Sequence, residues 1–366
     1  LMTATKDSVE VSYLYEMLEG QVAVLSSGYL SPEQALEVLT SLRNSAVYTA
    51  RQHSYLLYPD RELTRFVDKN IIPEALLKDS KLLTTLVASG DTSLVEKDSQ
   101  GGYHFNGAFN NVDSAKAILA SLKENGYQDL VEQEQSLIEE IFDSVFNHRQ
   151  FTGRSGGMYA YEGLGSIYWH MVSKLLLAAL ENFRKALEQG SDAVTVGKLA
   201  DCYFDIRAGI GFNKTPDNYG AFPTDPYSHT PGFAGAKQPG MTGQVKEDLL
   251  SRAGELGVKV QAGALCFEPV LLRYYEFMEE AQVFSYVDIH QNKNEIQLAM
   301  NSLAFTVCQV PIVYQKSDEN VIEAHAKDGS INHLKGNQLD LKISQSIFSR
   351  SGEYVKIIVF IDPQNL

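Results

Sequence analysis

One stretch of the sequence places several reactive side chains at the mouth of a helix. Residues 151–178 read FTGRSGGMYAYEGLGSIYWHMVSKLLLA and contain five glycines and the chain's only tryptophan, Trp169. Arg154, Glu162 and His170 add a cation, a carboxylate and an imidazole. Sugar rings are bound by such a set, because aromatic faces stack on C–H groups while polar side chains bond the hydroxyls. We therefore predict a sugar-binding cleft here, with Glu162 as a candidate proton donor.

Two further segments combine glycine, aromatic and hydrogen-bonding residues just before a predicted helix. EKDSQGGYHFNGAFNNVDS spans residues 96–114, and a loop without helical or strand periodicity spans residues 207–241 and leads into MTGQVKEDLL. Loops of this length inside a compact domain are usually functional or disordered, and the aromatic residues of 207–241 favour a binding loop. If the helices form a ring, all three junctions can lie at one end of it and line a single cleft.

Glu162 and Asp225 are the carboxylates that we select as catalytic acid or base. Cleavage of a glycosidic bond with inversion needs an acid at the leaving oxygen and a base roughly 6.5–9.5 Å away. A phosphorylase uses phosphate in place of the base and its water, and Thr242 and Gln244 at a helix start form a candidate anion site. A plainer interpretation of Glu162 is that a carboxylate is favoured at any helix N-terminus. Glu247, one turn into its helix, is a further carboxylate to consider.

The other residues that we expect to line the cleft share aromatic, amide, imidazole or charged side chains in these three segments. They are Asp98, Tyr103, His104, Asn106, Arg154, Tyr161, Trp169, Tyr219 and His229, together with Thr242 and Gln244. Trp169 and His170 also have an ordinary interpretation as buried core residues of an apolar helix. We expect no metal site, because the sequence has no cluster of cysteines and histidines with ligand spacing.

Composition and charge narrow the classes of partner. The 366 residues are 44% hydrophobic and 21% charged, and the formal charge of −15 argues against nucleic acid as a partner. No apolar run is long enough to span a membrane, so we expect a soluble protein, cytoplasmic or periplasmic, without membrane insertion. The start of the chain does not look like a signal peptide or an initiator, and we expect an N-terminal remainder of a longer chain. The predicted partner is a small or polymeric carbohydrate, with no cofactor other than inorganic phosphate as a candidate co-substrate.

Periodicity divides the chain into a helical part and a strand-rich part. Up to about residue 255 the apolar spacing is mostly helical, and SPEQALEVLTSL begins with a capping box formed by Ser31 and Gln34. DSAKAILASLKENG and DLVEQEQSLIEEIFDSVF predict a helical hairpin that turns at Gly126. From residue 256 onward we expect strands, including NQLDLKISQSIF, with one helical piece at 269–279 and a hairpin at Asp328-Gly329.

The order of parts resembles the inverting glycoside hydrolases and phosphorylases built on an (α/α)6 barrel, such as the cellobiose- and maltose-phosphorylase-like families. The resemblance covers residues 90–366, and its motifs are YGAFPTDPYSHTPGFAGAKQPGMTGQVKEDLLSRAGELGV and GALCFEPVLL. It implies a mainly α fold, with an (α/α)6 toroid over residues 1–280 and a smaller antiparallel β domain over 281–366. The Asp-Trp-Asn-Asp loop that carries the acid in cellobiose-phosphorylase-like enzymes is absent, and KDSQGGYHFN with Asp98 takes its place in the order.

The resemblance thus predicts a carbohydrate-active enzyme that cleaves glycosidic bonds, by hydrolysis or phosphorolysis. Two other functions stay open at this point. A polysaccharide lyase also combines an α/α toroid with β-sheets, and a non-catalytic glycan-binding module would use the same aromatic groove without paired carboxylates. Serine-triad chemistry has no support, because the sequence has no G-x-S-x-G elbow.

Overall fold

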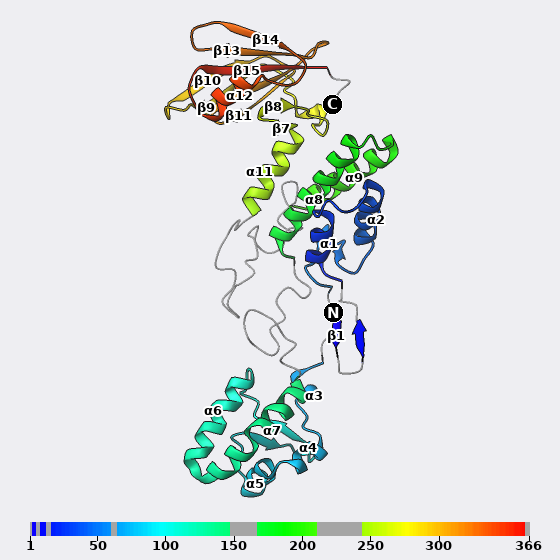
Figure 1. Ribbon diagram of the computed structural model, residues 1–366, viewed down its shortest axis with the longest axis vertical. Coiled ribbons are helices and arrows are strands. Elements are labelled where there is room, and N and C mark those ends of the chain that lie inside the picture. Colours follow the sequence, from blue (N-terminus) through cyan, green and yellow to red (C-terminus); the bar gives the residue numbers. More distant parts are fainter. Residues whose placement is uncertain are drawn as a thin grey trace. The chain divides into compact units, whose positions relative to one another are not determined.

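The computed structural model describes residues 2–4, 8–11, 16–59, 64–146, 167–210 and 244–362. The chain forms two compact units, and the first interrupts the second. Unit 1 comprises Leu1–Glu16 and Leu56–Ile167, and unit 2 comprises Met17–Tyr55 and Tyr168–Leu366. Figure 1 colours the chain from the N-terminus to the C-terminus and labels many of the helices and strands.

Unit 1 is built from short helices, two small hairpins and one long helical pair. The hairpins are β1 (Met2–Ala4) with β2 (Val9–Val11), and β5 (Val95–Lys97) with β6 (Tyr103–Phe105). The helices are α3 (Phe66–Lys69), α4 (Glu74–Asp79), α5 (Lys81–Ser89), α6 (Val112–Leu122) and α7 (Gln128–Phe146).

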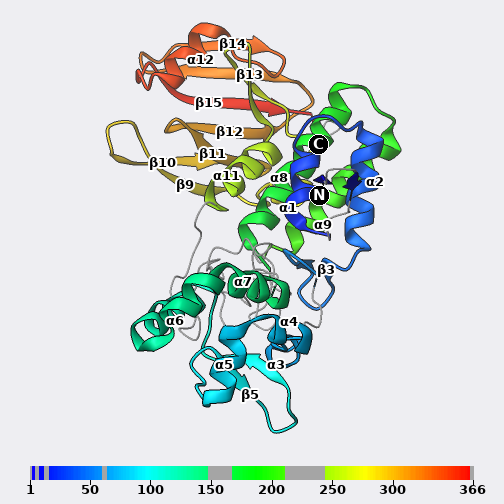
Figure 2. The same cartoon turned by 60° about the horizontal axis from the view of Figure 1, so that its bottom comes forward.

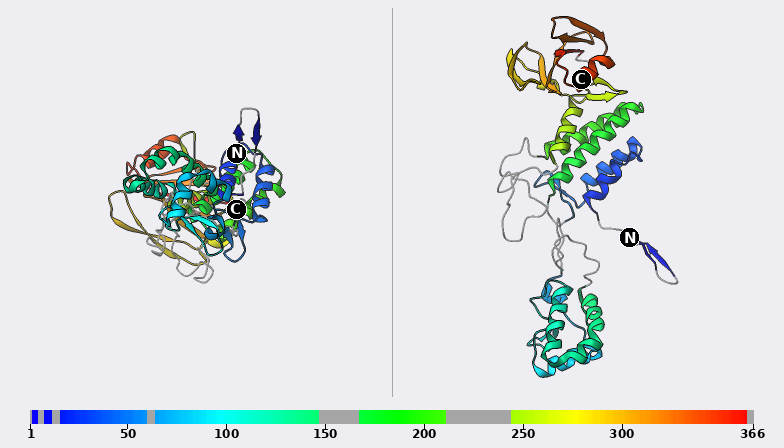
Figure 3. Two further views of the ribbon diagram at one scale, coloured as in Figure 1. Left: turned by 90° about the horizontal axis from the view of Figure 1, so that it is seen from below. Right: turned by 60° about the vertical axis from the view of Figure 1, so that its left-hand side comes forward.

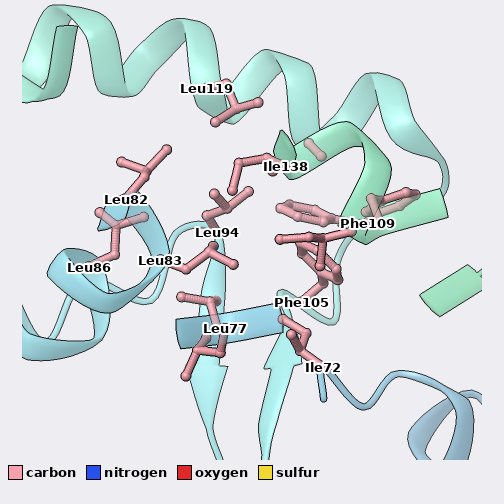
Figure 4. Packing of buried hydrophobic residues seen from close by; sticks show 14 of the residues in the cluster. Ile72, Leu77, Leu82, Leu83, Leu86, Leu94, Phe105, Phe109, Leu119 and Ile138 are labelled. Atoms are coloured by element: carbon pink, nitrogen blue, oxygen red, sulfur yellow. The ribbon is translucent and has the colours of Figure 1, made fainter. Parts of the chain in front are cut away.

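The predicted helical hairpin in unit 1 is confirmed. Asn111 caps α6 by accepting from the backbone N–H groups of Asp113 and Ser114, and Gly126, at φ +95°, breaks the helix before α7. The facing sides of the helices pack into one apolar core, shown in Figure 4. In it, Phe142 contacts Phe105 of β6 and Phe146, with ring centroids 5.0 and 4.7 Å apart. This core fixes β6, and with it the predicted residues of the 96–114 segment.

Within the described ranges, five helices form the helical part of unit 2. They are α1 (Leu18–Leu25), α2 (Pro32–Arg43), α8 (Trp169–Glu188), α9 (Ala193–Ala208) and α11 (Gln244–Glu255). A small hairpin, β3 (Tyr48–Thr49) with β4 (Ser54–Tyr55), follows α2. The capping box at the start of α2 is confirmed, since Ser31 accepts from the N–H of Gln34 and the Gln34 side chain accepts from the N–H of Ser31.

The α1–α2 and α8–α9 pairs lie side by side, as the right-hand view of Figure 3 shows. Asn182 of α8 donates to the Leu25 carbonyl at 2.9 Å, and Lys185 donates to the carbonyls of Gly28 and Leu30 at 2.7 and 2.6 Å. At the other end, Arg43 of α2 pairs with Asp205 of α9 at 2.8 Å. Two consecutive helical hairpins of unit 2 are therefore joined at both ends, although unit 1 separates them in the sequence.

The C-terminal part of unit 2 is rich in strands, as predicted. Before the main sheet come two hairpins, β7 (Val258–Gln261) with β8 (Ala264–Phe267), and β9 (Gln282–Val287) with β10 (Lys293–Leu298). The main sheet has the order β11-β12-β15-β13-β14, which Figure 2 shows. Its strands are β11 (Ser302–Val307), β12 (Val310–Lys316), β13 (Val321–Ala326), β14 (Ile331–Lys335) and β15 (Tyr354–Ile361).

The predicted antiparallel β domain contains one parallel strand pair. β12 and β15 run parallel, while the other neighbours in the sheet are antiparallel. The cause is the crossover after β14, where α12 (Leu341–Phe348) returns the chain so that β15 enters between β12 and β13.

That crossover also corrects two local predictions. NQLDLKISQSIF contains α12 instead of a strand, because Asp340 caps it by accepting from the N–H of Ile343, and Ile343 and Ile347 face the core on one side of a helix. The helical piece predicted at 269–279 is one 3₁₀ turn, Tyr274–Glu276. The hairpin at Asp328-Gly329 is confirmed between β13 and β14, with Gly329 at φ +88°.

The helices of unit 2 have the hairpin repeat that an α/α toroid uses, but the ring itself and the boundary at residue 280 stay predictions. Residues 280 and 281 both belong to unit 2. Among the helices in the described ranges, none combines the length and apolar character needed to cross a membrane.

Candidate functional site at the start of helices α8 and α11

Helix α11 turns its polar side inward. Its buried residues are Gln244, Glu247, Ser251, Gly254 and Glu255, whereas Leu249 and Leu250 are 67% and 53% exposed. A surface helix usually buries its apolar stripe. Burying two carboxylates on one helix costs free energy unless partners compensate, so this face marks either a structural ion pair or a site.

Helices α8 and α11 run in the same direction, and their N-termini therefore lie at the same end of the helix pair. The residue numbers of the contacting pairs increase along both helices: His170 contacts Glu247, Ser173 contacts Asp248, and Leu180 contacts Gly254. Gly254 permits the close approach, since a Cβ there would lie 2.2 Å from Cδ2 of Leu180.

A carboxylate, an imidazole and a phenol follow one another at this end. Nε2 of His170 lies 3.2 Å from Oε2 of Glu247, and Nδ1 of His170 lies 3.4 Å from the hydroxyl of Tyr168. The Glu247 side chain is 4% exposed and that of His170 17%. Neither Nε2 nor Oε2 completes a hydrogen bond with any residue in the described ranges, because the pair is close but not aligned. Lys246 approaches the other carboxylate oxygen at 3.5 Å from an exposed position.

A second pair lies one turn deeper on α8. Ser173 donates to Asp248 at 3.4 Å, and burial together with the nearby Glu247 charge raises the pKa of Asp248, against the opposing effect of the Ser173 hydrogen bond. The hydroxyl of Ser251 is buried and has no hydrogen-bond partner within the described part of the chain. We call Tyr168, His170, Ser173, Gln244, Glu247, Asp248 and Ser251 the α8–α11 polar face. Its residues are buried or partly buried. Within the described part of the chain, Nε2 of His170, Oε2 of Glu247 and the Ser251 hydroxyl are its buried atoms without a hydrogen-bond partner.

Both helices of the α8–α11 polar face follow a predicted site segment in the sequence. Residues 151–166 end two positions before Tyr168 gives way to α8 at Trp169, and residues 211–243 end just before α11 begins at Gln244. Trp169 and Gln244 are the predicted cleft residues that lie in the described ranges here, and both are buried, at 3% and 5% exposure. The other predicted residues of these two segments lie outside the described residues: Arg154, Tyr161, Glu162, Tyr219, Asp225, His229 and Thr242.

The remaining predicted residues lie together in unit 1, on the β5–β6 hairpin. Asp98 accepts from the backbone N–H groups of Gln100 and Gly102, and its second oxygen lies 2.9 Å from Nε2 of His104. Nδ1 of His104 is hydrogen bonded to the Asn70 carbonyl. Both nitrogens of the imidazole and both oxygens of the carboxylate are therefore used to fold the turn.

The ionisation of this hairpin pair follows from its hydrogen bonds. The His104 hydrogen bond and the Gly102 N–H lower the pKa of Asp98 to about 2. Partial burial opposes protonation of His104, but hydrogen bonds to Asp98 and Asn70 outweigh it and raise the His104 pKa. Asp98 is therefore a poor proton donor at neutral pH.

Tyr103 and Asn106 hold the same hairpin. The Tyr103 carbonyl accepts from the N–H of Ile72, and its ring lies 5.4 Å from the Lys97 ammonium. Asn106 donates to the Thr92 carbonyl at 3.0 Å and accepts from the N–H of Ala108 at 2.9 Å. The local contacts of Asp98, Tyr103, His104 and Asn106 are structural, and their substrate-binding role stays a prediction.

The opposite end of α11 carries a second buried carboxylate, Glu255, whose hydrogen-bonding capacity is satisfied. Glu255 accepts from Tyr203 at 2.7 Å and pairs with Arg207 and Arg252, each at 2.6 Å. Arg252 also reaches Glu276 at 2.7 Å. Burial disfavours the charge on Arg252, but the hydrogen bonds to Glu276 and Glu255 outweigh it and raise the Arg252 pKa. Burial and then the Glu255 charge raise the pKa of Tyr203, which keeps it a neutral donor.

The pairing of His170 with Glu247 is the feature that sequence reasoning missed. Both residues were visible as candidates singly, but 77 positions separate them in the chain. The available signal was the stripe of polar residues at 244, 247, 248, 251 and 255, which share one side of a helix. Among the described residues, no group of three or more histidine, cysteine or acidic side chains could hold a metal ion.

Comparison with protein families identifies one part of the chain. Residues 63–149 match the family model described as GH149 phosphorylase insertion domain 2. No curated protein matches the chain. The matched range, just under a quarter of the chain, lies within the segment of unit 1 that interrupts unit 2, as expected for an inserted domain. The match supports a carbohydrate-active function related to the glycoside phosphorylases.

Proposed function

We propose that the protein is a glycoside phosphorylase that cleaves a glycosidic bond of an oligo- or polysaccharide with inorganic phosphate. The match of residues 63–149 to a phosphorylase insertion domain is the observation that carries the proposal. In the reaction, a phosphate oxygen forms a bond to the anomeric carbon, the glycosidic C–O bond breaks, and an acid protonates the leaving oxygen. The products are a sugar 1-phosphate and a shortened saccharide, with inversion at the anomeric carbon.

The α8–α11 polar face supports the location of this chemistry. It is buried or partly buried, carries two carboxylates and an imidazole, and follows in the sequence the segments that contain Glu162 and Asp225. One of these two residues is our proposed general acid. Thr242 and Gln244 are the proposed phosphate ligands, because the N-terminus of α11 begins at Gln244 and helix N-termini attract anions.

The proposed architecture is an (α/α)6 toroid interrupted by unit 1. Two features of unit 2 favour it: the side-by-side helical hairpins α1–α2 and α8–α9, and the shared direction of α8 and α11. In such a ring the inner helices run parallel and present their N-termini to one cleft.

The test is an incubation of the protein with β- and α-linked gluco-oligosaccharides, with and without inorganic phosphate. A sugar 1-phosphate that forms only with phosphate, and whose anomeric configuration is opposite to that of the broken bond, is the expected result. Release of free sugar at the same rate without phosphate would show a hydrolase instead. Glu162→Gln and Asp225→Asn, compared with the exposed control Glu280→Gln, identify the acid as the variant that loses at least about a hundredfold in kcat.

A further inference from the structure

The contact between His170 and Glu247 has the layout of an oriented imidazole. The carboxylate is buried, and it faces the buried Nε2 edge of the ring. The other ring nitrogen, Nδ1, lies 3.4 Å from the Tyr168 hydroxyl. Tyr168 is partly exposed and stands at the end of the segment that contains Glu162.

A purely structural ion pair explains this contact less well. The same helix builds a structural carboxylate at Glu255, where Tyr203, Arg207 and Arg252 all bond to it at 2.6–2.7 Å. Glu247 has instead one unaligned imidazole and one exposed ammonium, at 3.2 and 3.5 Å. Buried polar atoms left without aligned hydrogen bonds destabilise a fold, so their presence calls for another reason.

We propose that Glu247 and His170 are positioning residues that orient the Tyr168 hydroxyl to accept a hydrogen bond from a hydroxyl of the saccharide. A carboxylate oxygen 3.2 Å from Nε2 favours, through its charge, the tautomer with the proton on Nε2 over the one that presents a lone pair there, although the two atoms are not aligned as a hydrogen bond. Nδ1 is then an acceptor and takes the hydrogen bond donated by Tyr168. The hydroxyl hydrogen of Tyr168 then points towards Nδ1 of His170, and the lone pairs of the hydroxyl oxygen point away from the imidazole.

The orientation also selects the ligand. A phenol oxygen that offers lone pairs attracts a donor such as a sugar hydroxyl, whereas a phosphate dianion offers acceptors and would be repelled. The charged groups around the pair agree with this, since Glu247 and Asp248 place two carboxylates beside one Lys246 ammonium. This inference rests on the proposed phosphorylase function. It assigns the relay of Glu247, His170 and Tyr168 to binding of the saccharide and not of phosphate.

The first test is kinetic. Tyr168→Phe and Glu247→Gln are each expected to raise the KM for the saccharide roughly three- to tenfold and to leave the KM for phosphate within about twofold. The double variant should be no worse than the worse single variant, since both remove the same oriented hydroxyl. Controls are Tyr275→Phe and Glu280→Gln, two exposed positions of unit 2.

The second test does not need turnover. Nitrogen-15 spectra of the histidine rings, with the His170 signals assigned through His170→Gln, report which nitrogen carries the proton. The Nε2–H tautomer is expected in the wild type, and Glu247→Gln should weaken that preference. An Nδ1–H tautomer in the wild type, independent effects of the two substitutions, or a rise confined to the phosphate KM would each overturn the relay.

The two hypotheses fail differently. Absence of phosphate-dependent turnover in the wild type would count against the proposed function itself. Wild-type phosphorolysis that Tyr168→Phe leaves unchanged would preserve the proposed function and reject the relay.

Discussion

Helix α11 carries two carboxylates that are equally buried and differently supported. Glu255, at 2% exposure, is held by a tyrosine and two arginines, while Glu247, at 3% exposure, faces one imidazole that is not aligned with it. Burial of a charge is stabilising only when hydrogen bonds and counter-charges replace the lost water. We therefore expect the Glu255 end of the helix to contribute to stability, whereas Oε2 at the Glu247 end has no hydrogen-bond partner among the described residues.

The difference follows from what each end of α11 packs against. The Glu255 end meets α9 and the 274–276 turn, and Tyr314 of β12 donates to the Leu256 carbonyl just beyond it. The Glu247 end meets the first turns of α8, and residues 151–166 precede this helix in the sequence. Functional residues usually lie where chain segments enter a rigid scaffold.

Removing the satisfied carboxylate should have the largest effect on stability. Glu255→Gln leaves Arg207 and Arg252 without their shared counter-charge, and we expect a loss of about 3 kcal/mol in the free energy of unfolding. Urea unfolding followed by circular dichroism measures it. A change below about 1 kcal/mol would mean that the cluster is solvated and that the two ends of α11 do not differ.

The close approach of α8 and α11 is tested at Gly254. Gly254→Ala places a methyl group within 2.2 Å of Leu180, and we expect a loss of about 2 kcal/mol and lower activity, because the polar face separates. The matched control is Gly197→Ala in α9, where a Cβ meets no heavy atom within 4 Å. Alanine should stabilise that position by about 0.5–1 kcal/mol, since it favours helix more than glycine does. Equal effects at both glycines would contradict the close packing.

The unsatisfied carboxylate should behave in the opposite way from Glu255. Glu247→Gln removes a poorly compensated buried charge, so we expect unfolding stability to change by less than about 1 kcal/mol while kcat/KM for the saccharide falls roughly three- to tenfold. Parallel urea unfolding and steady-state kinetics on one preparation make the comparison. A loss of stability as large as that of Glu255→Gln would assign Glu247 a structural role.

The smallest effect is expected at the Asp98–His104 pair, in which Asp98 is exposed and His104 partly buried. The pKa of Asp98 falls from 3.8 to about 2 on folding, so its contribution is present above pH 3.8 and is lost as the pH drops towards 2. The raised pKa of His104 adds stability that is full below its unfolded pKa of about 6.5 and is lost as the pH rises through the folded value. Amide hydrogen exchange at Gln100 and Gly102 should be slowest between about pH 4 and 6.5, relative to intrinsic rates, and Asp98→Asn should remove that window.

Much of the local structure could be predicted from the sequence, because caps and turns depend on residues a few positions apart. The Ser31 capping box, the hairpin of α6 and α7 around Gly126 and the turn at Asp328-Gly329 all follow from short motifs. The strand predicted from the alternating pattern around Leu341 was wrong, since a cap at Asp340 and a buried face of two isoleucines favour a helix there.

For the candidate site too, some features follow from the sequence and others only from the tertiary structure. Sequence alone determined which segments carry the residue types from which we predict sugar binding, and the match of residues 63–149 supports the phosphorylase relation that the overall layout suggested. Tertiary structure decided that His170 and Glu247, 77 positions apart, meet across two parallel helices, and that β15 pairs between β12 and β13. These contacts depend on burial and on helix and strand packing between distant segments, which local propensity and spacing do not encode.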